Sequence, residues 1–270
     1  AAQSFVGNSW ELSNVTTEIN AMGPLNILNA IRVVNQKIKF YQASTSELYG
    51  NSAEKIQNEN TSFQPTSPYA ISKLHAYWTT INFRNSYNMF CCNGILFNHE
   101  SHIRGIEFVT RKISDGVAQI FYGKKDCISL GNIDSKRDWG FAGDYVEAMW
   151  LMMKNKKPDD YVIATSKKYS IRDFLKISFA EIGISDWKNF INIDNSFKRP
   201  VDVTSLCGNY DKAKIDLGWT PKTSFKELVI MMVQEDLKRH KKIGSKIKII
   251  NNIRNKENLK ISDIAKKVSA

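Results

Sequence analysis

The chain has 270 residues, 42% of them hydrophobic and 24% charged, which is the composition of a globular protein with room for one large domain or two. No apolar run approaches the ~20 residues that a membrane helix needs, so we expect no membrane association. Most of the net charge of +11 comes from residues 241–270, and no stripe of Arg interleaved with aromatic residues appears, so we expect no nucleic-acid partner.

The predicted elements alternate between helix and strand over the first 155 residues. In chain order, the patterns predict a helix over 19–35, a strand over 37–45, a helix over 67–87, a strand over 89–97, a helix over 108–123 and, within 138–155, a helix after Gly143. Ser67 and Pro68 are the expected N-cap and first residue of the second helix. This alternation is typical of an α/β protein with a doubly wound parallel sheet.

A smaller lobe of short strands and helices is predicted after residue 150. Residues 160–165 have the pattern of a short strand, and a helix is expected to begin at Ser170, with Asp173 at the capping-box position. Ser224 and Glu227 form a second capping box ahead of the last strongly apolar helix. Residues 244–270 have the composition of a basic, flexible tail.

A glycine-rich turn that would cradle a dinucleotide is absent from the sequence. Rossmann-like sheets carry such a turn after their first strand. We therefore expect the chain to lack the first strands of its sheet, to be a truncated piece of a longer protein and to be inactive by itself.

The cysteines and histidines give no sign of a metal site. Cys91, Cys92, Cys127 and Cys207 lack CxxC spacing, and the four histidines do not cluster as zinc ligands do. We expect reduced cysteines, no bound metal and a cytoplasmic location.

Hydroxyl and carboxylate side chains follow the predicted strand 37–45, in the stretch FYQASTSELYG. Thr45 ends the strand and Glu47 follows it, at the edge where open α/β sheets bind ligands. Tyr69 and Lys73 are four residues apart on a predicted helix and therefore lie on one face. An ammonium beside a phenol lowers the tyrosine pKa from ~10, so Tyr69 is a candidate general base for an alcohol.

Thr45, Tyr69 and Lys73 resemble the catalytic triad of the extended short-chain dehydrogenase/reductases, which act on nucleotide sugars with a nicotinamide cofactor. Glu47 narrows the resemblance to dehydratases, because oxidation of an alcohol alone needs no such carboxylate. The stretches FYQASTSELYG, SPYAISKLHAYW, NGILFNHES, FVTRKI and LGNIDSKRDWG are similar to signature segments of the GDP-mannose 4,6-dehydratase family. The resemblance covers most of residues 1–240.

The resemblance implies dehydration of GDP-mannose to GDP-4-keto-6-deoxymannose with NADP, in a dimer or tetramer. It assigns catalysis to Thr45, Glu47, Tyr69 and Lys73. It assigns cofactor contacts to Ala2, Gln3, Ser4, Tyr69, Lys73, His99 and Arg104. It assigns substrate contacts to Asn98, Val109, Lys112, Arg137, Arg199 and Asp202, of which the two arginines also suit a diphosphate.

The expected division is a Rossmann-like NADP-binding domain over 1–150 with interleaved substrate segments, a sugar-nucleotide lobe over 151–243 and the tail over 244–270. Three positions depart from the family pattern: Val15 and Phe197 replace tyrosines, and Asp202 replaces a glutamate. Two alternatives remain open from the sequence. One is a sugar-nucleotide epimerase or reductase of the same fold, and the other is a non-catalytic GDP-sugar-binding fragment.

Overall fold

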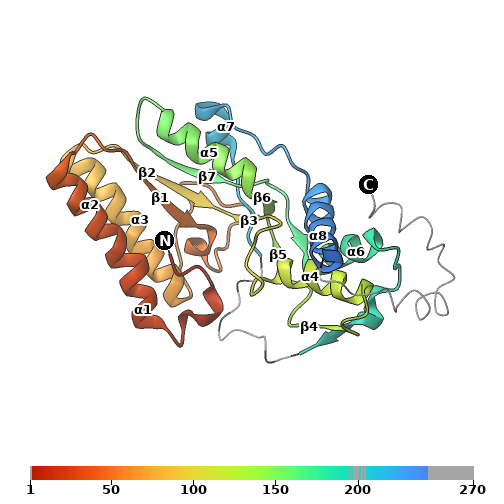
Figure 1. Ribbon diagram of the computed structural model, residues 1–270. Helices are drawn as coiled ribbons and strands as arrows, with labels where there is room; N and C mark the ends of the chain where they lie inside the picture. Colours follow the sequence, from red (N-terminus) through yellow and green to blue (C-terminus); the bar gives the residue numbers. More distant parts are fainter. Residues whose placement is uncertain (1, 195, 197–200, 202, 204, 243–270) are drawn as a thin grey trace. The chain divides into compact units, whose positions relative to one another are not determined.

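The computed structural model describes residues 2–194, 196, 201, 203 and 205–242 (Figure 1). Arg199, Asp202, Phe197 and the expected tail over 244–270 therefore lie outside the described residues. The chain divides into two compact units, each assembled from three separate segments. The first unit holds residues 1–99, 136–168 and 199–222, and the second holds residues 100–135, 169–198 and 223–270.

The first unit is built on a parallel sheet of three strands in the order β1-β2-β7. The strands are β1 (Phe40–Thr45), β2 (Cys91–Leu96) and β7 (Asp160–Ile163), and Thr45 is paired with Leu96 at the carboxyl end. Every residue of β2 is buried, which explains its nearly continuous apolar sequence. The predicted α/β fold with a parallel sheet is confirmed.

Helices cover the two faces of this sheet (Figure 1). On one face, Ile95 and Val162 pack in a core with Tyr77 of α3 (Pro68–Tyr87). On the other face, Cys92 and Ile163 pack with residues of α5 (Ala142–Lys154) and α7 (Asp211–Leu217). Alternate residues of each strand thus enter two separate cores.

One helical prediction differs from the structure in its bounds, and another agrees with it. The helix expected over 19–35 begins earlier, as α1 (Ser13–Thr17), and runs through the π-helical turn η2 (Glu18–Met22) into α2 (Gly23–Val34). Pro24 follows this turn and has no N–H to donate, so the regular pattern of helical hydrogen bonds is interrupted there. The helix expected after Gly143 is α5, which begins at Ala142 directly after strand β6 (Trp139–Phe141), so this prediction is confirmed.

The remaining elements of the first unit are short. They are η1 (Val6–Ser9), η3 (Ser46–Tyr49), β3 (Asn98–Glu100), which pairs with β6 and ends at the first residue of the second unit, and β5 (Lys136–Arg137). Gly50 ends η3 at φ +53°, and a Cβ there would lie 1.8 Å from the carbonyl oxygen of Gln64. Only glycine therefore fits the turn that leaves the strand end.

The second unit packs α4 (Val109–Phe121), α6 (Ile171–Glu181) and α8 (Phe225–Lys242) against one another, with β4 (Ile128–Leu130) parallel to β9 (Ile191–Ile193). It also contains β8 (Tyr169–Ser170) and η4 (Trp187–Phe190). Both predicted capping boxes form: Ser170 with Asp173 at the start of α6, and Ser224 with Glu227 at the start of α8.

No helix in the part of the chain that the structure describes is long and apolar enough to cross a membrane. Cys91, Cys92 and Cys207 are buried free thiols, and Cys127 is a half-buried one.

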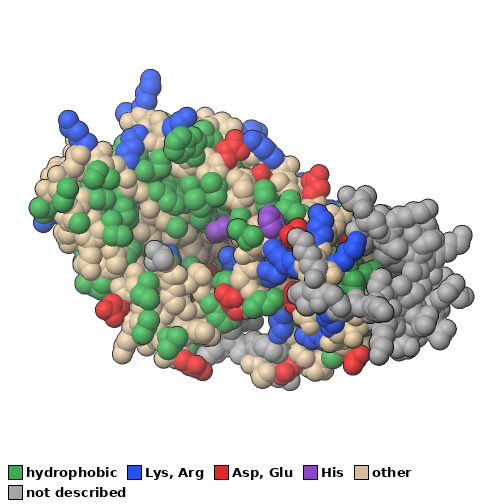
Figure 2. Space-filling model, in the orientation of Figure 1, with side chains coloured by type: hydrophobic (Ala, Val, Ile, Leu, Met, Phe, Trp, Pro, Cys, Tyr) green, Lys and Arg blue, Asp and Glu red, His purple; other side chains and the backbone are tan. Residues whose placement is uncertain are grey.

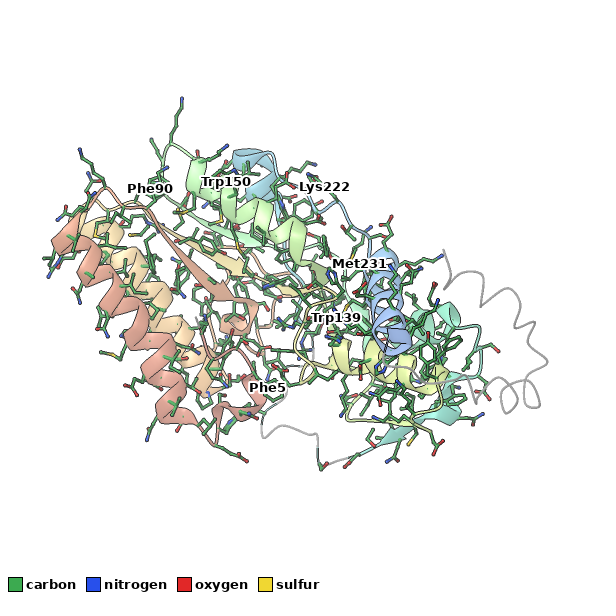
Figure 3. The ribbon with its side chains drawn as sticks, in the orientation of Figure 1. Phe5, Phe90, Trp139, Trp150, Lys222 and Met231 are labelled. Atoms are coloured by element: carbon green, nitrogen blue, oxygen red, sulfur yellow. The ribbon has the colours of Figure 1, made fainter. Side chains whose placement is uncertain are left out.

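The side chains of the described residues are drawn in Figure 3, where Trp139 of β6, 2% exposed, is labelled.

Candidate active site

Thr45 and Glu47 lie where β1 passes into η3. The backbone of Thr45 is extended, and its Oγ1 accepts a hydrogen bond from the Glu47 N–H at 3.2 Å. Because the hydroxyl accepts this bond, its own proton remains available to a ligand oxygen. Thr45 is 8% exposed and Glu47 is half-buried, so both lie at the boundary between the core and the surface.

Helix α3 holds Tyr69 and Lys73 beside the same strand. Its start is fixed by Ser67, whose Oγ accepts from the Ala70 N–H at 3.1 Å, and by Pro68 in the first turn, as predicted. Lys73 Nζ donates to the carbonyl of Ala43 at 3.0 Å and lies 6.0 Å from the centroid of the Tyr69 ring. The structure therefore brings Tyr69 and Lys73 to the strand that ends in Thr45.

The Lys73 ammonium is buried, with 5% of the residue exposed. Burial lowers the pKa of Lys73 to about 8, because the charged form loses its hydration. Near neutral pH the amine is still mainly charged, so it remains a cation next to the Tyr69 ring. An ammonium has three donors, and the bond to Ala43 uses one of them.

The segment that contains Ala2, Gln3 and Ser4 is fixed by Asn20, a residue that the sequence did not single out. The Gln3 N–H donates to Asn20 Oδ1 at 3.0 Å, and Asn20 Nδ2 donates back to the Gln3 carbonyl at 2.9 Å. Asn20 is 1% exposed and lies in the π-helical turn η2. The Oε1 atom of Gln3 is buried and has no hydrogen-bond partner among the described residues, whereas Ala2 and Ser4 are exposed.

No sequence pattern would have identified Asn20, because a single polar residue in an amphipathic helix usually faces solvent. Asn20 lies in a π-helical turn, and hydrophobic spacing does not reveal such a turn.

Asn98 and His99 lie on β3, and both are half-buried. His99 Nδ1 is 2.9 Å from the carbonyl of Phe97, and since a carbonyl only accepts, Nδ1 is the protonated nitrogen. The imidazole stacks on Tyr145 with ring centroids 5.1 Å apart. These contacts fix the orientation of the ring.

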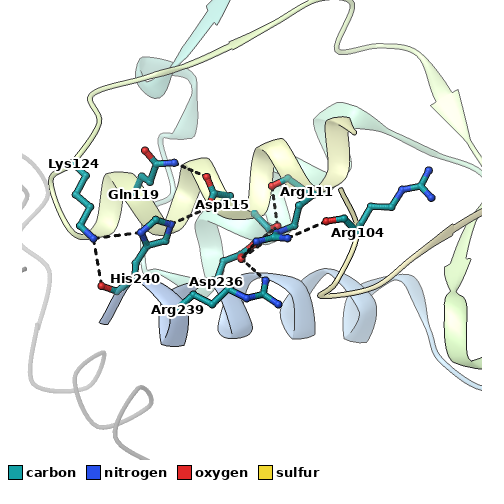
Figure 4. Close-up of polar contacts among 9 residues, drawn as sticks. Arg104, Arg111, Asp115, Gln119, Lys124, Asp236, Arg239 and His240 are labelled. Carbon is teal, nitrogen blue, oxygen red and sulfur yellow. Dashed lines mark hydrogen bonds and ion pairs between the residues drawn. The ribbon is translucent and has the colours of Figure 1, made fainter. Parts of the chain in front are cut away.

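Arg104 lies in the second unit, on the loop before α4, and its backbone is held in place by a network of charged side chains (Figure 4). Arg111 Nη1 donates to the Arg104 carbonyl at 3.0 Å, and Arg111 itself is ion-paired with the fully buried Asp236 at 2.7 Å. The Arg104 guanidinium lies 3.5 Å from the centroid of the Phe108 ring and forms an ion pair with Glu100 at 3.2 Å. Burial raises the pKa of Glu100, and the charge of Arg104 opposes that rise.

Val109 and Lys112 occupy the first turn of α4 in the same unit. Lys112 is half-buried; burial lowers its pKa, nearby Lys125 lowers it further, and Asp194 acts in the opposite direction. A half-buried cation at the start of a helix is chemically suited to an anionic group.

Arg137 lies on β5 of the first unit, directly before the buried carboxylate of Asp138. Asp138 Oδ1 accepts from the N–H and hydroxyl of Thr165 at 2.9 and 2.6 Å, and Oδ2 accepts from the Gly208 N–H at 3.2 Å. Burial raises the pKa of Asp138 to about 6 in spite of these bonds. Asp138 therefore ties three chain segments together beside Arg137, which is half-buried.

The predicted residues are thus distributed over both units. Thr45, Glu47, Tyr69, Lys73, Ala2, Gln3, Ser4, Asn98, His99 and Arg137 belong to the first unit, whereas Arg104, Val109 and Lys112 belong to the second. The described residues contain no group of three or more His, Cys, Asp or Glu side chains that could hold a metal ion.

Comparison with known proteins gives consistent results. The sequence model of a family described as GDP-mannose 4,6 dehydratase matches residues 1–232. GDP-mannose 4,6 dehydratase 1 of Arabidopsis thaliana is 49% identical over 246 residues, which are 90% of this chain and 68% of the relative. The human GDP-mannose 4,6 dehydratase is 48% identical over 254 residues, 87% of this chain and 68% of the relative. The chain spans about two thirds of the length of these relatives.

Solved structures with low sequence identity share the fold. RMD from Pseudomonas aeruginosa complexed with NADPH has a TM-score of 0.79 and 21% identity, covering 88% of this chain and 80% of its own. DesIV, a dTDP-glucose 4,6-dehydratase from Streptomyces venezuelae with NAD and TYD bound, has a TM-score of 0.80 and 20% identity, covering 89% and 72%.

Proposed function

Because this chain belongs to the GDP-mannose 4,6-dehydratase family, we propose that it dehydrates GDP-mannose to GDP-4-keto-6-deoxymannose, with NADP as its cofactor. The observation that carries the proposal is the contact of Lys73 with β1, which puts Lys73 and Tyr69 beside the strand that ends in Thr45 and continues to Glu47. A sugar bound at this strand end would meet a hydroxyl, a phenol and a carboxylate.

The first step is removal of the proton from the 4-hydroxyl. Tyr69 Oη accepts this proton, and the Thr45 hydroxyl donates a hydrogen bond to O4, since its oxygen already accepts from the Glu47 N–H. The charge of Lys73 stabilises the phenolate of Tyr69 by simple electrostatics. A bound NADP would supply the hydride acceptor for C4 and the hydride donor for C6.

The second step is elimination of water across C5 and C6, and Glu47 is the residue proposed for it. Oxidation at C4 acidifies the C5 proton, and the carboxylate takes that proton and delivers it to the departing C6 hydroxyl. One water is lost, and the cofactor ends each turnover in its starting state. Half-burial of Glu47 leaves the carboxylate accessible to a ligand and shields it in part from bulk water.

The residues of the first unit fit a nicotinamide cofactor. The buried, unpartnered Oε1 of Gln3 is an acceptor that suits a ribose hydroxyl or a carboxamide N–H, and Lys73 has further donors for ribose hydroxyls. Ala2, Ser4, His99 and Arg104 complete the proposed cofactor contacts. The solved RMD structure is a complex with NADPH and the DesIV structure a complex with NAD, so the proposal of NADP rests on the family resemblance.

The proposed contacts to GDP-mannose are Asn98, Val109, Lys112 and Arg137, together with Arg199 and Asp202 outside the described residues. Arg137 is assigned to the diphosphate, because a guanidinium binds phosphate oxygens through two parallel hydrogen bonds. We also retain as a proposal the division into a cofactor domain over 1–150 and a sugar-nucleotide lobe over 151–243.

Assembly into a dimer or tetramer and a cytoplasmic location are further parts of the proposal. Val15, Ile19 and Met22 are 39–45% exposed and recur at helical spacing along α1 and η2, and Ile71 and Trp78 of α3 are 58% and 55% exposed. Apolar side chains also lie on the visible surface of the first unit in Figure 2. Exposed apolar surface of this kind favours association.

The proposal is tested with Glu47→Gln, and Glu11→Gln serves as a control because Glu11 is an exposed carboxylate of the same unit. The assay uses the protein expressed from its complete gene, because this chain by itself is expected to be inactive; there we expect the parent and the control to form a product lighter by one water, without net reduction of NADP. Glu47→Gln should form none and still bind GDP-mannose within about twofold of the parent. Product formation by Glu47→Gln at the parent rate would exclude its assigned role, and absence of product from the parent with NADP would exclude the function.

A further inference from the structure

A chain of buried polar side chains crosses the β1-β2-β7 sheet of the first unit. It consists of Ser44, Asn93, Asp160 and Arg84, from β1, β2, β7 and α3 respectively. Ser44 is 4% exposed, Asn93 0% and Asp160 6%. Polar groups placed in a core raise the energy of the folded state unless all of them are hydrogen-bonded, so their arrangement is tightly constrained.

Asn93 is the centre of this chain. Its Oδ1 accepts from the Ser44 hydroxyl at 3.2 Å, and its Nδ2 donates to Asp160 Oδ1 at 2.8 Å and to the Tyr77 carbonyl at 3.4 Å. A carboxylate and a carbonyl can only accept, which fixes the orientation of the carboxamide. One side chain thus binds two neighbouring strands and a helix.

Asp160 is held by an equally complete set of donors. Arg84 forms two parallel bonds to its carboxylate, at 2.9 and 2.7 Å, and the Asn93 N–H adds a third at 3.0 Å. Arg84 Nη1 also donates to the Cys91 carbonyl at 3.0 Å. The positive charge of Arg84 on α3 is therefore neutralised by the buried carboxylate of Asp160 on β7.

The elements joined by Asn93 are those that carry the proposed catalytic groups. Ser44 directly precedes Thr45, and Tyr77 follows Lys73 by one helical turn on α3. A second link between the same two elements is the bond from Lys73 to the Ala43 carbonyl. A shift of β1 along α3 would break both links and move the Lys73 ammonium relative to the Tyr69 ring.

We propose that Asn93 is a positioning residue, whose carboxamide fixes the strand end at Thr45 relative to the helix that carries Tyr69 and Lys73. Its meaning for catalysis rests on the function proposed above. The geometry itself can be measured without turnover, because Tyr69 senses the position of the Lys73 charge.

The test uses Ser44→Ala, which removes the link to β1 and leaves the bonds among Asn93, Asp160 and Arg84 intact. The control is Thr80→Val, because Thr80 is 0% exposed and its hydroxyl bonds only to the Ala76 carbonyl of its own helix, at 2.8 Å, among the described residues. Both variants lose one buried hydroxyl, so similar falls in melting temperature are expected.

Two readouts separate positioning from stability. The ionisation midpoint of Tyr69 is obtained from tyrosinate absorbance, with Tyr69→Phe in each background as the blank. Below pH 8, where Lys73 is mainly charged, the ionised fraction of Tyr69 in Ser44→Ala should fall about twofold, equivalent to a rise of about 0.3 pH units in its midpoint, if the ammonium moves by about 1 Å at an effective dielectric constant of about 20. In the protein that converts GDP-mannose, kcat should fall about tenfold with KM within about twofold. Thr80→Val should change neither.

The proposal is overturned if the ionisation of Tyr69 is the same in Ser44→Ala as in Thr80→Val. A parent protein that does not convert GDP-mannose would disprove the proposed function, whereas the Tyr69 titration would still decide the role of Asn93.

Discussion

Replacing Lys73 by methionine removes a buried charge and keeps a long unbranched side chain. Burial lowers the pKa of Lys73 from 10.5 to about 8 in the folded protein, whereas the unfolded chain keeps the ordinary value. One pKa unit corresponds to about 1.4 kcal/mol, so the charged amine costs the folded state about 3 kcal/mol near neutral pH. Lys73 is only 5% exposed, so solvent screening does not reduce this figure much.

The variant also loses the hydrogen bond to the Ala43 carbonyl, which is worth about 1–2 kcal/mol and leaves a carbonyl unpaired. The difference predicts that Lys73→Met increases the free energy of unfolding by about 1–2 kcal/mol near pH 7. Turnover should be lost, because the proposed partner of Tyr69 is gone. A gain in stability with a loss of function is typical of a residue kept for catalysis.

The sign of the pH dependence follows from the two pKa values. Between pH 8 and 10.5 the unfolded chain binds more protons than the folded protein, so the stability of the parent rises with pH. Above pH 10.5 the Lys73 amine is neutral in both states and its burial does not destabilise the folded protein. As the pH falls from 10.5 to about 8 this advantage is lost, and below pH 8 the full cost of the buried charge is present. From near pH 7 to near pH 9.5, the parent should gain about 2 kcal/mol relative to Lys73→Met, and the advantage of the variant should disappear.

Urea denaturation of the parent and Lys73→Met at these two pH values measures the effect. Lys55→Met, at an exposed lysine of the same unit, is the control and should show no such dependence. A stability difference that is the same at both pH values, or a variant that is less stable than the parent near pH 7, would refute the reasoning.

Two further predictions concern the frame of the site. Arg84→Met leaves the carboxylate of Asp160 buried without its charged partner and should lower the free energy of unfolding by about 3–5 kcal/mol in urea; a loss below about 1 kcal/mol would contradict this. Gly50→Ala should cost about 2–4 kcal/mol, because φ is +53° and the new Cβ would meet the Gln64 carbonyl oxygen. Gly218→Ala, with φ +66° and nothing within 4 Å, should cost only about 1 kcal/mol. Equal melting temperatures for Gly50→Ala and Gly218→Ala would therefore disprove the clash at Gly50.

Much of the frame around the proposed catalytic residues was predictable from local signals. The Ser67–Pro68 start of α3 is a local capping pattern, and it fixes the spacing of Tyr69 and Lys73 on the helix. The apolar run of β2 indicated a strand buried on both faces, and its parallel pairing with β1 puts Thr45 at the carboxyl end of the sheet. The cap and the apolar run depend on neighbouring residues in the sequence, whereas the pairing of β1 with β2 follows from the alternation of helices and strands.

The contacts that could not be predicted join residues far apart in the sequence. Nothing in the pattern of β2 shows that Asn93 meets Asp160, 67 residues later, because a polar residue in a strand gives no sign of its partner. The bond between Asn20 and the Gln3 backbone joins residues 17 apart, and Asn20 lies in a π-helical turn that hydrophobic spacing does not reveal. The division into two interleaved units likewise follows from long-range packing and not from composition.

The most direct test of the central claim is the fate of the hydrogen at C4 of the sugar. GDP-mannose that carries deuterium at C4 is incubated with the protein and NADP, and the product is analysed by NMR and mass spectrometry. We expect GDP-4-keto-6-deoxymannose with deuterium at C6 and no net reduction of NADP. A product that lacks deuterium at C6, or a 4-epimer of the substrate in its place, would contradict it.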